Sequence, residues 1–387
     1  FDELDAAFAE EGQENGFEIR FLKGYVETEW VSFLKKRNGG KNDDQLFLGA
    51  ELEFEVDLAT SLSAYLRPNI YIDALDPSIR EYRFLDAYID YRRSTWDLRV
   101  GQFVENWGIA DTFNPIDLYS RRDLSRDLLD AERLGESGAR FRLLFNGGEV
   151  IGEPTLSLYV SPIFQEAAFA HDESRYSLSQ DPFVLREGRA REPDGLDQML
   201  VALRAQSTLN TALANADVQL ILGAGPGRSP TFVATPGASD KVNLTPEYFG
   251  TAFFGGGFRA VPNQGAWAEY TLKLEVVYKE PYKLDGVPTE LPDGYLQYAI
   301  GVDRIFNNLL IENDQLTMTV EYIGENGADD YSSDFRPFQS DLIVRGLWEA
   351  AFAVSEARSG HVDTVVVARA TRSLLGCLRC CRLLCSQ

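Results

Sequence analysis

At 387 residues, the chain is long enough for two or three soluble domains or for one large barrel. It contains 37 Lys and Arg residues against 60 Asp and Glu residues, and the resulting formal net charge of −23 argues against a nucleic-acid partner. No apolar run approaches the roughly 18 residues that a membrane-spanning helix needs, which excludes helical spanning.

The chain begins with an acidic, Ala-rich stretch over residues 1–15, which we interpret as a polar lead-in. No charged-then-apolar leader precedes it, so we take the chain as a mature form whose signal peptide has been removed.

A different pattern follows. Between residues 48 and 58, apolar side chains such as Leu52 and Phe54 alternate with Glu51, Glu53 and Glu55. A period of two predicts a β-strand with one apolar face and one acidic face.

Alternation of this kind returns along the chain as far as about residue 350. Clear examples lie at residues 85–92, 96–100, 139–145, 270–278 and 316–322. Most runs last about ten residues, which is the length that a tilted strand needs to cross hydrocarbon. Strands in soluble sheets average about half that length. The pattern therefore favours strands that span a membrane.

The connections between these strands are alternately short and long. Short links are predicted at residues 59–61, 94–95, 146–149, 210–212, 262–265 and 307–314. Long links are predicted at residues 35–44, 105–136, 165–195, 225–249, 280–293 and 324–339. The link at 76–79 falls where the alternation calls for a long link, but it is short. Outer-membrane barrels have short turns on one side of the membrane and long loops on the other, whereas a soluble sandwich has no reason to keep that parity.

We therefore predict an all-β fold, with a single antiparallel transmembrane β-barrel over residues 16–350. About 14 strands are visible, and about 16 are expected in an intact chain. Residues 351–387 are basic and lack alternation, and they contain all 4 cysteines. We interpret this tail as sequence that is not native to the barrel. A Cys-free body suits a protein that crosses an oxidising periplasm.

The longest link with a dense run of charge covers residues 105–136. We expect this loop to fold inward and to narrow the bore, because opposed Arg and carboxylate groups at a constriction select solutes by charge. The alternative is that these charges pair with one another and hold the loop rigid. The predicted constriction residues are Asp111, Asn114, Asp117, Arg121, Arg122, Asp123 and Arg126 in the loop, with Arg140 and Arg142 on the wet face of the next strand.

A resemblance covers about fifty residues around this loop. Its elements are Gly101-Gln102, Trp107-Gly108, Asp111, Asn114-Pro115, Asp117-Leu118 and Arg121-Arg122-Asp123. This pattern resembles a loop signature in uncharacterised bacterial outer-membrane porin-like families related to the alginate-export barrels. The resemblance implies a β-barrel that passes a solute, and it does not name the solute. The chain departs from such proteins at its C-terminus.

Other candidate sites have simpler alternatives. The ladder of Glu51, Glu53 and Glu55 either attracts cations into the bore or is balanced by Arg and Lys on neighbouring strands. Trp107 either stacks on a sugar or lies at the membrane interface. Catalysis finds little support, because His171 and His361 are the only histidines and no nucleophile motif accompanies them. The cysteine spacing lacks a second well-spaced pair for zinc, so no metal site and no cofactor are predicted.

The sequence thus predicts a non-enzymatic channel in the outer membrane of a Gram-negative bacterium, passing hydrophilic solutes and narrowed or gated by residues 105–136. Its expected partners are outer-membrane lipid, lipopolysaccharide and a small hydrophilic or oligosaccharide solute, with no nucleic acid, and the chain is expected to be a monomer or a homotrimer. Two alternatives remain open. One is a secreted or surface all-β protein for carbohydrate binding or adhesion, and the other is an outer-membrane hydrolase that uses His171.

Overall fold

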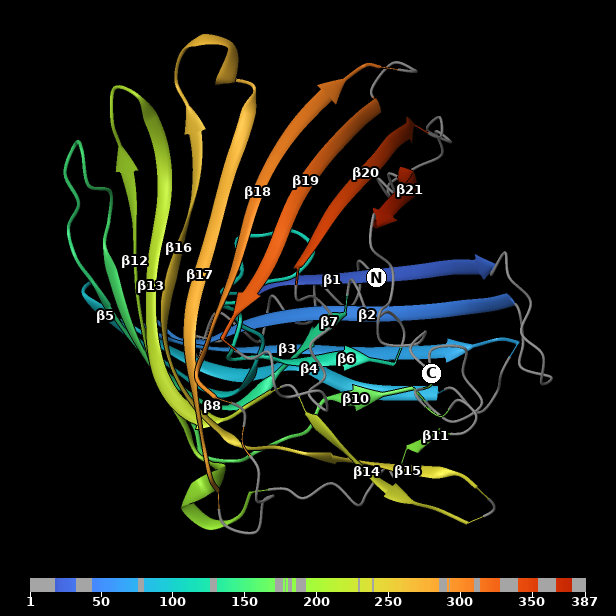
Figure 1. The fold of residues 1–387 in the computed structure, drawn as a ribbon. Helices are drawn as coiled ribbons and strands as arrows, with labels where there is room; N and C mark the ends of the chain where they lie inside the picture. The colour runs from blue at the N-terminus through green and yellow to red at the C-terminus, as the bar shows by residue number, and fades with distance from the viewer. Residues whose placement is uncertain are drawn as a thin grey trace.

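The computed structural model is all-β, as predicted (Figure 1). It describes residues 18–32, 44–75, 80–125, 131–170, 177, 179, 183–185, 193–228, 230–238, 240–284, 291, 293–309, 314–327, 340–353 and 367–377. In this part of the chain, the only helical elements are two short 3-10 turns, Gly195–Gln198 and Gly265–Trp267. The described residues include no helix long and apolar enough to cross a membrane.

Fifteen strands pair into one sheet. They are β1 (Glu18–Ser32), β2 (Asp44–Ala59), β3 (Leu62–Asp73), β4 (Arg80–Arg92), β5 (Trp96–Phe103), β8 (Glu136–Leu144), β9 (Thr155–Ser161), β12 (Leu200–Asn210), β13 (Ala214–Pro226), β16 (Gly250–Pro262), β17 (Tyr270–Tyr282), β18 (Tyr295–Asn307), β19 (Asp314–Asn326), β20 (Ser340–Ala353) and β21 (Val367–Cys377).

The order of the strands in this sheet follows their order in the sequence, and every pairing is antiparallel. Fourteen of the fifteen strands precede β21, which confirms the predicted number. The predicted parity of the links is also confirmed. β2 and β3 are joined by a tight turn after Ala59, whereas residues between Phe103 and Glu136 separate the neighbours β5 and β8. β21 lies within the tail in which the sequence pattern indicated no strand.

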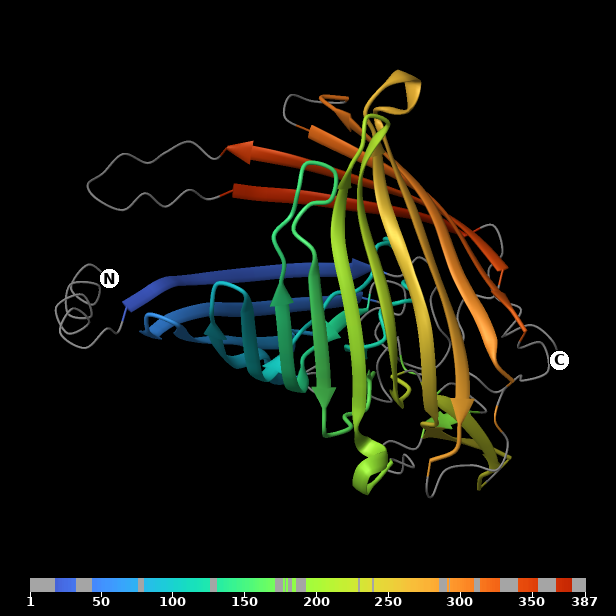
Figure 2. The same ribbon diagram turned by 90° about the vertical axis from the view of Figure 1, so that its left-hand side faces the viewer.

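The sheet rolls around on itself into an open barrel. Figure 1 shows β1–β4 (blue) lying across the direction of β16–β19 (yellow to orange). In Figure 2, the red strands β20 and β21 lie above the dark-blue strand β1. β1 and β21 are the two ends of the pairing order, and no ladder joins them among the described residues.

The two faces of the sheet have opposite chemistry, in the reverse of a soluble protein. On β17, the side chains of Lys273 and Glu275 are buried while Val276 and Tyr278 are exposed. On β19, Glu321 is 0% exposed and the neighbouring Val320 is 43% exposed. Charged residues in soluble proteins are almost never fully buried, and apolar side chains fill the core. The outer face of this sheet is therefore apolar, and the inner face contains buried charged side chains beside buried apolar ones.

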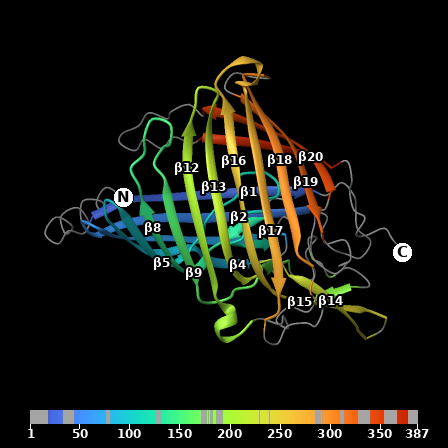
Figure 3. The same ribbon diagram turned by 60° about the vertical axis from the view of Figure 1, so that its left-hand side comes forward.

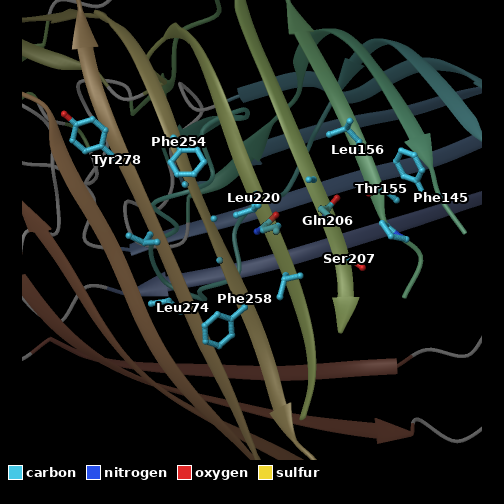
Figure 4. Close-up of a pocket in the computed structure, with 18 of the residues that line it drawn as sticks. Phe145, Thr155, Leu156, Gln206, Ser207, Leu220, Phe254, Phe258, Leu274 and Tyr278 are labelled. Atoms are coloured by element: carbon cyan, nitrogen blue, oxygen red, sulfur yellow. The ribbon is translucent and has the colours of Figure 1, made fainter. Parts of the chain in front are cut away.

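The outer face includes a shallow apolar groove with a volume of about 980 Å³ (Figure 4). It crosses strands β9 to β18, which stand side by side in Figure 3. Its walls include Leu156, Leu220, Phe254, Leu274 and Tyr278, and its floor contains Gly256. A contiguous apolar surface of this kind needs an apolar environment such as lipid or another protein.

The long connections carry two small sheets of their own. Strands β6 (Arg121–Leu124), β7 (Glu132–Leu134) and β10 (Ala168–Phe169) form the first, in the order β10-β6-β7. Strands β11 (Phe183–Leu185), β14 (Thr231–Pro236) and β15 (Val242–Glu247) form the second, in the order β11-β15-β14. β6 and β7 lie inside the segment predicted to fold inward, and this segment forms the candidate site.

Candidate functional site

The segment that joins β5 to β8 is called the inward loop here (residues 105–136), and its described residues, 105–125 and 131–136, pack against the inner face of the sheet. Its side chains Trp107, Ile116 and Tyr119 are fully buried. They share one apolar cluster with residues from β5, β9, β12, β13, β16 and β17, namely Phe103, Tyr159, Leu200, Ala202, Ile221, Phe253 and Val277. The cluster gives the loop an apolar surface to bury, and this burial favours the inward conformation.

Two buried carboxylates bind the loop backbone to the far wall, which we define as β13, β16, β17, β18 and β19. Glu275 on β17 accepts N–H groups from Ile109, from Ala110 at 2.7 Å and from Ile116 at 3.3 Å. Charge-assisted hydrogen bonds of this kind are about twice as strong as neutral ones. Because the donors are backbone groups, these contacts do not depend on the loop's charged side chains.

Glu321 on β19 accepts two further backbone N–H groups, from the loop residues that follow Ala110. Its two oxygens accept the N–H groups of Asp111 at 2.6 Å and Thr112 at 2.9 Å. On β13, the side-chain amide of Gln219 donates to the carbonyl of Trp107, and on β16 Arg259 donates to the carbonyl of Ile109 at 3.2 Å. The far wall therefore binds residues 107–116 along most of their length.

The Asp111 side chain adds an ion pair to the far wall. Its Oδ2 lies 2.5 Å from Nζ of Lys273, which also pairs with Asp303, and 3.2 Å from the hydroxyl of Thr319. Burial by itself raises the pKa of Asp111, but the charge and hydrogen bond of Lys273 outweigh it and hold this pKa below its usual value. Lys273 and Thr319 therefore hold the Asp111 carboxylate against the far wall.

The near wall, which we define as β4, β5, β8, β9 and β12, holds the loop through guanidinium groups. Glu105 at the start of the loop is 2.7 Å from Arg140 on β8 and accepts a hydrogen bond from Tyr159 on β9 at 3.2 Å. Farther along, Arg83 on β4 is 2.6 Å from Asp123 and 2.8 Å from Glu132. The inward loop thus spans the interior from one wall to the other.

The loop's own charges also pair within it. Oδ2 of Asp117 lies 2.6 Å from Nη2 of Arg122 and 2.6 Å from Nε of Arg133, and the Asp117 side chain is fully buried. These contacts are those that the rigid-loop alternative predicts. Asp123 pairs with Arg83, as described above. Arg126 lies outside the described residues.

Arg140 and Arg142, which the sequence placed on the wet face of the strand, pair with acids on the sheet. Nη2 of Arg140 is 3.2 Å from Oδ1 of Asp97, and Nη2 of Arg142 is 2.7 Å from Oδ2 of the same carboxylate. Both arginines therefore have carboxylate partners on the wall.

Glycines and an asparagine shape the loop where it meets itself and the wall. A Cβ on Gly108 would stand 1.9 Å from Oδ1 of Asn114, so only glycine lets Asn114 fold back over this point. A Cβ on Gly257 of β16 would stand 2.9 Å from Cδ1 of Ile109 and 2.5 Å from the carbonyl oxygen of Leu274. The absence of a side chain at Gly257 therefore lets Ile109 of the loop pack closely against the strand. The predicted site residue Asn114 thus has a structural role here.

Both interpretations of Trp107 that the sequence left open, sugar stacking and membrane anchoring, are wrong. The ring is 0% exposed and packs against Tyr119, with centroids 5.7 Å apart, and against Tyr159 at 5.1 Å. A tryptophan in a polar stretch indicated a contact with solute or lipid, but the inner face of the sheet supplied an apolar cluster instead.

The acidic ladder of β2 is largely balanced by neighbouring strands, which is the simpler of the two predicted outcomes. Glu51 is 3.2 Å from Arg67 on β3. Glu55 is 3.3 Å from Arg20 on β1 and 3.4 Å from Arg92 on β4. Glu53 stands opposite Lys23 in the pairing of β1 with β2.

Sequence reasoning placed Lys273, Glu275 and Glu321 on polar strand faces but assigned them no role in the site. Their only signal was a charged side chain on the wet face of a predicted strand, and many residues share that signal. Which of them meets the loop depends on contacts across more than 150 residues of sequence, as in the bond from Ile109 to Glu275 with its separation of 166.

No cluster of metal-binding side chains appears in the described part of the chain. No group of three or more His, Cys, Asp and Glu side chains there could hold a metal ion. His171 and His361 both lie outside the described residues, and so do the cysteines after Cys377.

No protein-family model matches the chain, and no curated protein matches it either. Among solved structures, it is similar to a loop-deletion form of OmpT, an outer membrane protein of Vibrio cholerae, at 9% identity and a TM-score of 0.48, over 87% of this chain and 89% of that one. It is also similar to the outer membrane channel DcaP of Acinetobacter baumannii at 13% identity and a TM-score of 0.40, over 88% of each chain. An anion-selective porin from Comamonas acidovorans matches at 11% identity and a TM-score of 0.43, over 88% of this chain and 85% of that one.

These likenesses are too distant to assign an activity to the chain. The resemblance of the inward loop to families related to the alginate-export barrels has no match among them and stays a prediction.

Proposed function

We propose that this chain is a β-barrel of the Gram-negative outer membrane that passes hydrophilic solutes through a bore narrowed by the inward loop. The observation that carries the proposal is the reversed chemistry of the sheet. Exposed apolar rows such as Leu220, Phe254 and Ile300 cover the outside, and buried acidic residues such as Glu275 and Glu321 line the inside. Lipid would cover the apolar outer face, and water in the interior would solvate the charged groups of the inner face.

The position of the loop determines where a solute would pass. The loop binds the near wall and the far wall as defined above, so the remaining route would run beside β1–β3. There the loop arginines would face the ladder of Glu51, Glu53 and Glu55 across the route. Opposed charges of this kind select solutes by charge and dipole. Lipid and lipopolysaccharide would cover the outer face, and the assembly would be a monomer or a homotrimer.

Single-channel recording in a planar bilayer tests this proposal. We expect discrete conductance steps for the refolded chain and a reversal potential under a salt gradient that reports charge preference. Replacing Arg121 and Arg122 together by Ala should shift that potential toward cation selectivity, because two positive charges leave the constriction. Replacing Arg304, which pairs with the exposed Glu269 outside the loop, is the matched control and should leave the potential unchanged.

The rival functions predict different results. A secreted adhesion or carbohydrate-binding protein would partition into the aqueous phase of a detergent extraction, and a channel would stay with detergent. A hydrolase that uses His171 would lose activity in His171→Ala, whereas conductance would not change. Folded protein that stays in detergent but produces no conductance would overturn the channel proposal.

A further inference from the structure

The inner face of β1–β3 borders the solute route proposed above. Tyr88 on β4 packs against the apolar cluster that holds the inward loop, and its ring stacks on Tyr65 of β3 with centroids 5.0 Å apart. Tyr65 in turn contacts the ring of Phe21 on β1, with centroids 6.1 Å apart. Because successive side chains along a strand point to opposite faces, these rings identify which residues of β1–β3 face the interior.

Carboxylates outnumber basic side chains on this face. The acidic residues that share it, in the register of the strand pairings, are Glu18, Glu27, Glu29, Glu51, Glu53, Glu55, Asp57 and Asp73. The basic residues that share it are Arg20, Lys23 and Arg67. The adjoining strand β4 does not supply the missing positive charge, because its inner face adds Glu81, Asp86 and Asp90 against Arg83 and Arg92.

The arginines on this face already have carboxylate partners. Arg20 pairs with Glu55 at 3.3 Å, and Arg67 pairs with Glu51 at 3.2 Å. These contacts neutralise part of the acidic face, and the remaining carboxylates are left with one lysine.

Glu27 and Glu53 carry charge that this pairing does not cover. Neither forms an ion pair among the described residues. In the pairing of β1 with β2, Glu27 stands opposite Gly49, which offers no side chain, and Glu53 stands opposite Lys23. Negative charge is therefore left over on the face of the route.

Buried oxygens on the same face lack hydrogen-bond donors. Oδ2 of Asp73 and Oε1 of Gln45 have no partner in the described part of the chain, and these residues are 2% and 3% exposed. Nε of Arg67 is a donor without a hydrogen bond, but it lies 3.2 Å from Oε1 of Glu51 within their ion pair. Leaving a buried acceptor unpaired is costly, so these oxygens favour a cationic or donating group nearby.

We propose that the channel selects positively charged solutes, and that the inner face of β1–β3 sets this preference through Glu27 and Glu53. A passage lined by an excess of one charge concentrates ions of the opposite sign and repels ions of the same sign. The inference rests on the proposed channel function and narrows hydrophilic solutes to cationic ones. The inward loop does not reverse the sign, because its described arginines Arg121, Arg122 and Arg133 are outnumbered by Glu105, Asp111, Asp117, Asp123, Glu132 and Glu136.

The reversal potential under a KCl gradient tests this preference in bilayers. We expect the wild type to pass K⁺ in preference to Cl⁻. The double variant with Glu27→Gln and Glu53→Gln should lower the ratio of the two permeabilities at least about twofold, because two negative charges leave the route. Glu269→Gln is the matched control, since Glu269 is exposed and pairs with Arg304 away from β1–β3, and it should keep the wild-type ratio.

Cysteine modification measures the same charge without requiring conduction. Tyr25→Cys places a thiol on the inner face of β1, opposite Glu51, in a chain whose native cysteines are replaced by serine. The thiol is treated in detergent with a cationic trimethylammonium or an anionic sulfonate methanethiosulfonate. We expect the ratio of cationic to anionic rates to be about tenfold higher than at Thr211→Cys in an exposed turn. The double variant should lower the ratio at Tyr25→Cys, and circular dichroism verifies each fold.

The two measurements separate this inference from the channel proposal. A reagent preference that depends on Glu27 and Glu53 supports the cationic preference even where bilayers show no conductance, in which case only the channel proposal fails. Equal reagent ratios at the two positions overturn the inference whatever the current shows. Conductance without a preference for K⁺, or with a preference that the double variant leaves unchanged, also overturns it and leaves the channel proposal intact.

Discussion

The inward loop binds the two walls of the barrel by different chemistry. At the far wall, Glu275 and Glu321 accept backbone N–H groups, so the wall supplies the charge and the loop supplies only its backbone. At the near wall, Arg140 and Arg83 pair with loop carboxylates, so both partners are side chains. Backbone contacts fix the path of the loop whatever its side chains are, while side-chain pairs depend on charge on both sides.

This difference explains how one segment could be both fixed and selective. Residues 107–116 lie along the far wall, where their path is determined by five bonds to two carboxylates. Residues 117–125 and 131–134 hold arginines of the candidate constriction, and Asp123 and Glu132 among them pair with Arg83 of the near wall. A substitution in the second part can change the charge of the bore while the first part keeps the loop in place.

The largest expected effect is the loss of the far-wall acceptor in Glu275→Ala. Three backbone N–H groups lose their partner, and each buried unpaired donor costs about 1–3 kcal/mol. We expect the free energy of unfolding in detergent to fall by about 3 kcal/mol or more, and the single-channel current to become larger and noisier. Glu275→Gln retains one carbonyl oxygen for Ile109 and Ala110 and should lose less. Wild-type stability in Glu275→Ala would contradict the role of this anchor.

Breaking the near wall should have a smaller effect. Arg140→Gln leaves Glu105 without its main partner, but Tyr159 still donates to Glu105, and Nη1 of Arg204 stays 3.8 Å from it. Asp97 keeps its contact with Arg142 at 2.7 Å. Removing one partner of a buried pair is destabilising, and with this compensation we expect about 2 kcal/mol in a denaturant titration. Arg304→Gln breaks an exposed pair and should change stability by less than about 1 kcal/mol. Equal losses of stability in both variants would show that burial does not make the near-wall pair more stabilising than an exposed pair.

Asp117→Asn distinguishes the two predicted roles of the loop charges. The variant weakens contacts to Arg122 and Arg133, for an expected loss of about 1 kcal/mol in thermal unfolding. If these arginines face the solute route, the reversal potential should move toward anion selectivity, because a negative charge leaves the constriction. An unchanged potential with a noisier current would indicate that the charges only hold the loop rigid.

The smallest effect is the response of the far wall to acid. The pKa of Asp111 is lower in the folded chain than in the unfolded chain, so its pair with Lys273 contributes stability above the ordinary carboxyl value of about 4 and loses it as the pH falls through the lowered value. We expect current fluctuations from this pair only below about pH 4 and none between about pH 5 and pH 8. Asp111→Asn should remove this acid response, and a response that persists in the variant would assign it to another group.

The regular part of the molecule was open to prediction because its information is local. A strand reveals itself by the period of its side chains, and the parity of the links between strands follows from short and long stretches of sequence. Leu272, Lys273, Leu274 and Glu275 alternate in the sequence as they do between the faces of β17. The inward loop could also be anticipated, from its length and its charges.

The partners of the loop could not be predicted from sequence. Asp117 and Arg122 suggested a field across the bore, and tertiary structure paired Asp117 with both Arg122 and Arg133 through contacts of 2.6 Å. Trp107 indicated a ligand or a membrane interface, and packing buried it. Arg228 gave no signal at all, because it approaches Glu136 only after the chain has passed through β8, β9, β12 and β13.

Sequence alone determined that this chain forms long antiparallel strands, in chain order, with an apolar face and a charged face, because alternation and link length are properties of neighbouring residues. Only tertiary structure decided which charged residues on the inner face meet the inward loop. Those contacts join strands far apart in the sequence, and their geometry depends on how far the sheet rolls and on which apolar side chains bury one another inside it.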